Sequence, residues 1–238
     1  MTTPTARPTV ILTAVMGFAV LGTTILGACA DPAAQPAIPH SQVTLPVVPN
    51  SVGVVAHSCD RVGARFLAGT SLADREEWYG SQLRAAGEHP LCQSPEQQPQ
   101  VVYRLTWIPS FHPSVIVRIE RTSVGYQLRA KTLSGAGGYD PGHLARDTVS
   151  SLAGTDLATL ARLLAAARFW QLPTTPLPDG MIGLDGAQWM LEGLSDGRYH
   201  IVDRWSPNSD GPDAAFRQLA DWLLGRSGLV DASIVREY

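Results

Sequence analysis

Residues 188–205, QWMLEGLSDGRYHIVDRW, contain two runs of alternating side chains on either side of a Ser-Asp-Gly sequence. This pattern predicts an antiparallel β-hairpin, because side chains alternate between the two faces of a strand and Asp-Gly favours a tight turn. We favour a three-residue loop at 195–197, since this register keeps one face of the hairpin apolar. It places Glu192 opposite His200. A two-residue turn is the alternative, and it places Glu192 opposite Ile201.

The favoured register gathers Glu192, His200 and Arg204 on the second face of the hairpin. These residues offer an acid, a titratable imidazole and a fixed cation within side-chain reach of one another. They are a candidate binding site, or a catalytic site of the hydrolase type. The alternative is a solvated sheet face with ordinary cross-strand ion pairs.

The rest of the chain extends this hairpin into a mixed fold. Three further strand-like runs are separated by turn residues, at 101–108, 114–120 and 126–133. Apolar side chains at helical spacing predict three helices, at 71–88, 155–170 and 213–229. Ser71 and Thr155 are the expected N-terminal caps of the first two helices. The order of elements predicts a single α+β domain with a mostly antiparallel sheet of about five strands and roughly three helices.

The first 28 residues have the pattern of an export signal. Arg7 precedes a run from 10 to 28 that contains no charged residue. The sequence Leu-Gly-Ala-Cys at 26–29 resembles the lipobox of bacterial lipoproteins. The resemblance implies cleavage before Cys29, attachment of diacylglycerol to its sulfur, and a lipid-anchored protein that faces the periplasm. An ordinary secretory peptide and an uncleaved transmembrane anchor are the alternatives.

The segment that follows Cys29 is rich in proline and alanine. We expect residues 29–50 to form an extended tether and 51–238 to form the folded domain. Cys59 and Cys92 are the two remaining cysteines. Export would place them in an oxidising compartment, so we expect a disulfide, with two buried free thiols as the alternative.

Charge and motif content exclude several classes of function. The chain has a formal net charge of −3, and loss of Arg7 with the signal changes it to −4, so no basic surface is expected for nucleic acid. The six histidines and the cysteines show no metal-ligand spacing, and we expect no metal or cofactor. A GxSxG sequence occurs at 193–197, but a hydrolase elbow requires a helix after the serine, and here a strand is predicted.

The glycine-rich stretch TLSGAGGYDPG, at 132–142, is interpreted as a pair of turns. Neither a P-loop nor a dinucleotide-binding fingerprint fits it, because no lysine follows and no helix begins directly after it. The glycines are expected to supply positive-φ positions. Tyr139 and Asp140 at its centre are candidate binding residues, with Tyr139 either packed inward or displayed.

Four stretches together resemble a group of uncharacterised exported proteins from Gram-negative bacteria: WYGSQLRAAGEHPL (78–91), LSGAGGYDPG (133–142), FWQLP (169–173) and GLDGAQWMLEGLSDGRYHIVDRWSP (183–207). The resemblance implies one coherent domain and assigns no activity. We therefore expect a membrane-tethered binding or interaction module whose partner is an envelope protein or a cell-wall component. A hydrolase that uses Glu192 and His200, and a purely structural envelope component, are the alternatives.

Overall fold

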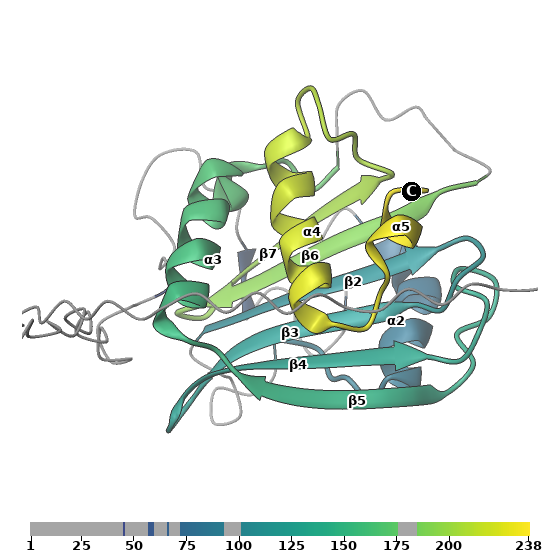
Figure 1. The fold of residues 1–238 in the computed structure, drawn as a ribbon, viewed down its shortest axis with the longest axis horizontal. Helices are drawn as coiled ribbons and strands as arrows, with labels where there is room; N and C mark the ends of the chain where they lie inside the picture. The colour runs from purple at the N-terminus through teal and green to yellow at the C-terminus, as the bar shows by residue number, and fades with distance from the viewer. Residues whose placement is uncertain (1–44, 46–56, 60–65, 67–71, 93–100, 176–184) are drawn as a thin grey trace, which may run out of the picture. The chain divides into compact units, whose positions relative to one another are not determined.

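The computed structural model describes residues 45, 57–59, 66, 72–92, 101–175 and 185–238. All of them belong to one unit, Ile38–Tyr238. Its centre is one antiparallel sheet in the order β1-β7-β6-β2-β3-β4-β5 (Figure 1). The strands are β1 (His57–Ser58), β2 (Val101–Pro109), β3 (Val115–Thr122), β4 (Gly125–Leu133), β5 (Leu144–Ser151), β6 (Ala187–Ser195) and β7 (Arg198–Trp205). The α+β class is confirmed, with six long strands in place of the expected five.

Helices cover both faces of the sheet, as Figure 1 shows. On one face lie α3 (Gly154–Ala166), α4 (Ala214–Ser227) and α5 (Ala232–Val235), and on the other lies α2 (Glu76–Ala85). The inner strands therefore contribute side chains to two separate apolar clusters, one on each face. Strand β2 is buried at all nine positions for this reason. Short 3₁₀ helices, η2 (Ala73–Arg75) and η3 (Phe169–Gln171), precede α2 and follow α3.

The three predicted helices are present, but their starts differ from expectation. Helix α3 begins one residue before the expected cap Thr155, with Ala153 as its N-cap, and the Asp156 carboxylate accepts a hydrogen bond from the Ala153 N–H at 3.1 Å. Ser71, the other expected cap, lies outside the described residues. The helix ends are as expected: Gly87 and Gly228 both adopt positive φ directly after their helices.

The β6–β7 hairpin has the two-residue turn, so the favoured register is wrong. Ser195 lies opposite Arg198, and Glu192 lies opposite Ile201 rather than His200. Asp196 and Gly197 both have positive φ, 48° and 70°, which is the backbone of a type I′ turn. The criterion of one apolar face misled the prediction because both faces of this sheet are buried.

Two strands were not predicted from the sequence. Strand β1 has only two residues, and Cys59 directly after it is disulfide-bonded to Cys92, which confirms the expected crosslink. Strand β5 forms the opposite edge of the sheet and is exposed at all eight positions, so it lacks the alternation that marks a half-buried strand.

The N-terminal part of the expected tether contributes to the core. Leu45 is 1% exposed and belongs to the apolar cluster that includes α3 and α4. Burial of a residue inside the range 29–50 means that contact with the folded body begins before position 51.

Candidate functional site

The predicted cluster of Glu192, His200 and Arg204 does not form, because the sheet separates its members. Glu192 lies opposite Ile201 and points to the α2 face, whereas His200 lies one position along β7 and points to the α3–α4 face. Arg204 shares the face of His200. The acid and the imidazole therefore cannot act on one substrate.

Glu192 is instead the centre of a buried ion network on the α2 face. Its side chain is 0% exposed, and its two carboxylate oxygens accept four hydrogen bonds. Arg104 donates two of them, from Nε at 2.7 Å and from a terminal nitrogen at 2.9 Å. The hydroxyls of Tyr79 and Tyr199 donate the others, at 2.8 and 2.9 Å. Burial, followed by the charge of Glu192, raises the pKa of both tyrosines, so both remain protonated donors.

Glu88, just after helix α2, extends the network. Its carboxylate pairs with Lys131 at 2.6 Å and with Arg104 and Arg118 at 3.3 Å each. Burial alone would raise the pKa of Glu88, but the three cations outweigh burial and hold that pKa below its ordinary value. Opposite charges are thus matched within the interior, which is typical of a structural network rather than of a reactive group.

His200 and Arg204 also have structural surroundings. The His200 ring is 0% exposed and packs against Phe169 and Trp170, with ring centroids 5.1 and 6.1 Å away. Arg204 donates to Asp213 at 2.8 Å and to the backbone oxygen of Thr174 at 2.9 Å. No solvent route to either side chain is needed for these contacts, and they fix the end of β7 against α4.

The other two candidates lie at an exposed surface. Tyr139 is displayed rather than packed inward: it is 72% exposed and stacks with Phe111, which is 59% exposed. The ring centroids are 6.2 Å apart, and the ring planes differ by 25°. Sequence reasoning missed Phe111, because one aromatic residue in a short turn has no pattern that distinguishes display from burial. Asp140 accepts a hydrogen bond from the Gly142 N–H at 2.9 Å, so its role is in the turn.

The loop that carries Tyr139 is fixed from beneath by helix α2. The indole N–H of Trp78 donates to the Gly138 oxygen at 2.9 Å, and the Gln82 amide donates to the Gly137 oxygen at 2.8 Å. Gly137 has φ +50°, and a Cβ there would overlap the carbonyl oxygen of Pro109 at the end of β2. The glycines therefore allow close packing of two loops, as their interpretation as turn residues requires. We name the resulting surface, Phe111 and Tyr139 on loops 110–114 and 134–143, the aromatic platform.

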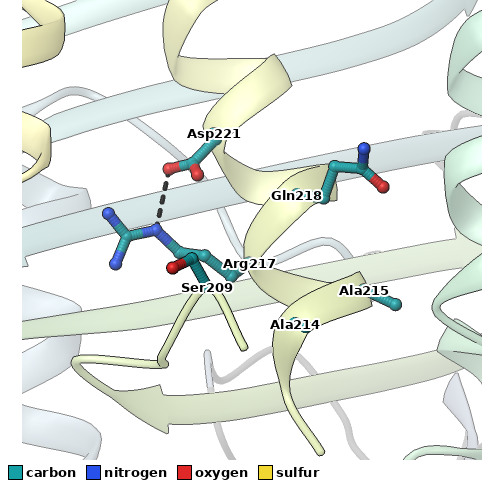
Figure 2. Close-up of a pocket in the computed structure, with 6 residues that line it drawn as sticks. All are labelled: Ser209, Ala214, Ala215, Arg217, Gln218 and Asp221. Carbon is teal, nitrogen blue, oxygen red and sulfur yellow. Dashed lines mark hydrogen bonds and ion pairs between the residues drawn. The ribbon is translucent and has the colours of Figure 1, made fainter. Parts of the chain in front are cut away.

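Helix α4 borders two open hollows, of about 450 and 310 Å³. Figure 2 shows the larger hollow and the Arg217–Asp221 pair, which lines both. The Arg217 guanidinium donates to Asp221 at 2.8 Å and to the backbone oxygens of Pro207 and Val235, and it lies 4.4 Å from the centre of the Trp189 ring. Because these contacts occupy the cation, it braces α4 against the sheet and offers no free charge to a ligand.

Within the described ranges, no group of histidine, cysteine and carboxylate side chains could hold a metal ion. No helix in the same ranges is long and apolar enough to cross a bilayer, and residues 1–28 lie outside them. A scan against models of protein families matches none of them, and comparison with curated proteins gives no significant match.

Proposed function

We propose that the chain is a lipid-anchored binding module of the bacterial cell envelope, and that the aromatic platform holds a saccharide of the cell wall. The observation that carries this proposal is the exposed, stacked Phe111–Tyr139 pair on a fixed loop scaffold. Large aromatic side chains are normally buried, and a pair of them displayed together is typical of a binding surface.

The chemistry of the two loops favours a neutral, ring-shaped ligand. Loops 110–114 and 134–143 contain a single carboxylate, Asp140, two histidines, and no lysine or arginine. An anionic lipid surface attracts clustered basic residues, which these loops lack. The apolar C–H faces of sugar rings pack well on aromatic rings, and polar groups at the rim can donate to and accept from their hydroxyls.

A fixed platform makes such binding more favourable. The hydrogen bonds from Trp78 and Gln82 hold the backbone beneath Tyr139 before any ligand arrives. Less conformational entropy is then lost on binding. The proposed acyl chains on Cys29 would keep this platform close to the membrane, since each buried CH₂ contributes about 0.8 kcal/mol. Separation of Glu192 from His200 leaves the hydrolase alternative without its catalytic pair.

The platform is tested with the full chain in detergent and purified cell-wall sacculi as the probe. The double variant Phe111→Ser/Tyr139→Ser should weaken sedimentation with the sacculi about 5- to 150-fold, as expected for two lost ring contacts. Val124→Ser is the matched control, because Val124 is 84% exposed but lies in the β3–β4 turn. Glycan strands freed of their peptides should compete for binding. Equal binding by both variants, or competition by the peptides alone, would contradict the proposal.

The lipid anchor is tested separately by intact mass. The chain extracted from a bacterial membrane should begin at Cys29 and carry the mass of added acyl chains, and Cys29→Ser should abolish both features. A chain that begins at Met1 without added mass would refute the anchor but not the platform.

A further inference from the structure

The two edges of the sheet differ in how they end. At one edge, β1 has two residues and stops at the disulfide-bonded Cys59. At the other edge, β5 runs for eight residues, and every one is exposed. Natural proteins usually shorten, cover or interrupt such an edge because its unpaired backbone groups can bind another strand. Strand β5 contains neither proline nor glycine.

The hydrogen bonding of β5 identifies which backbone groups are available. The Leu152 N–H donates to the Tyr126 oxygen at 3.0 Å, so this residue faces β4. In an antiparallel ladder, alternate residues bond to the same neighbour. The N–H and C=O groups of Asp147, Val149 and Ser151 therefore point away from β4, toward the open edge.

We propose that β5 pairs antiparallel with β5 of a second copy of the chain, with Val149 on the two-fold axis. A two-fold antiparallel pairing places one residue opposite itself and its neighbours opposite each other in turn. Centring on Arg146 or Asp147 would oppose like charges, which is unfavourable. Centring on Thr148 would place Asp147 opposite the apolar Val149.

The Val149-centred register avoids both problems. The two valines, each 55% exposed in the single chain, cover one another on the α2 face. Thr148 lies opposite Ser150 on the other face, where their hydroxyls can bond, and Asp147 lies opposite Ser151. Asp147 is already paired with Arg129 at 2.8 Å inside its own chain, so its charge does not oppose the approach of a second copy. The contact pairs backbone groups of Asp147, Val149 and Ser151 in each copy.

Strand pairing alone forms a small interface, below the roughly 1,000 Å² expected of a stable dimer. The dimer should therefore be weak and dependent on concentration. The pairing does not depend on the proposed saccharide binding.

Association is measured on the full chain in detergent by sedimentation at increasing concentration. The wild-type chain should form a dimer, and Val149→Lys should raise its dissociation constant about tenfold or more, because two lysines would face each other across the axis. Val124→Lys is the matched control and should behave as wild type, since it adds the same charge at another exposed valine. A wild-type chain that stays monomeric at the highest soluble concentration, or equal effects of the two lysines, would overturn the proposal.

The register is tested by oxidation of single-cysteine additions. Val149→Cys should give a disulfide-linked dimer, because residues of a hydrogen-bonded antiparallel pair have Cα atoms about 5.5 Å apart, within the range a disulfide spans. Thr148→Cys should crosslink more slowly, and the wild-type chain supplies the background from its own cysteines. Faster crosslinking through Thr148 than through Val149 would overturn the Val149-centred register.

Discussion

Replacement of Glu192 by glutamine should destabilise the fold rather than remove an activity. Glu192→Gln preserves size but removes the charge that accepts two hydrogen bonds from Arg104. It also presents an amide to Tyr79 and Tyr199, whose hydroxyls both donate to the carboxylate. The Arg104 side chain is 0% exposed, so after the change its charge has only Glu88 as a partner at 3.3 Å.

The size of the effect follows from this burial. Removal of one member of a buried ion pair typically costs about 3–5 kcal/mol, because the other charge stays in the interior without compensation. A domain of this size unfolds with a free energy of about 5–15 kcal/mol, so a large share would be lost. The midpoint of thermal unfolding should fall by about 6–20 °C, at roughly 2–4 °C for each kcal/mol.

Urea and thermal unfolding of the full chain measure this change, and Glu77→Gln provides the matched control. Glu77 also pairs with an arginine, Arg84 at 2.7 Å, but its side chain is 90% exposed. An exposed pair contributes little, so Glu77→Gln should unfold close to wild type. If Glu192→Gln unfolded with the same midpoint as Glu77→Gln, the inference that Glu192 holds the α2 face together would be refuted.

Three further perturbations probe other parts of the fold. Glu88→Gln should flatten the acid limb of a stability–pH curve: the lowered pKa of Glu88 gives stability that is present above its ordinary pKa of 4.5 and lost as the pH falls through the folded value. An unchanged acid limb would contradict that pairing. Serine at both Cys59 and Cys92 should lower the free energy of unfolding by about 3–4 kcal/mol in the chain-entropy model, measured by urea titration, since the crosslink spans 33 residues. Gly137→Ala should lower the thermal midpoint more than Gly197→Ala, because both have positive φ but only the first Cβ would meet another backbone atom; equal midpoints would mean that the two loops are not closely packed.

The helices were predictable because each carries its own pattern. Four residues expected on one face of the first helix, Leu72, Tyr79, Leu83 and Ala86, are all 2% exposed or less. The stripe expected on α4 is buried in the same way. The repeat of 3.6 residues survives whichever neighbour the helix packs against, so local sequence is sufficient to reveal it.

The edge strand and the aromatic platform were less accessible to sequence reasoning, for related reasons. Strand β5 has no buried face, so no periodicity marks it, and its strand conformation depends on hydrogen bonds to β4. Phe111 and Tyr139 are 28 positions apart in the chain and meet only because two loops pack at the same end of the sheet. Both features depend on pairings between distant segments, which a single sequence does not specify.

The wrong register of the β6–β7 hairpin shows how charge placement depends on the whole sheet. A hairpin considered alone favours one apolar and one polar face, and that criterion joined Glu192 to His200. In the structure, β2 lies beside β6 and places Arg104 directly opposite Glu192, so the partner of the acid comes from another strand. A carboxylate in an otherwise apolar strand therefore indicates a cation on the next strand as readily as it indicates a reactive site. The local signal of Asp-Gly, whose two residues both take positive φ here, was the better guide to the turn.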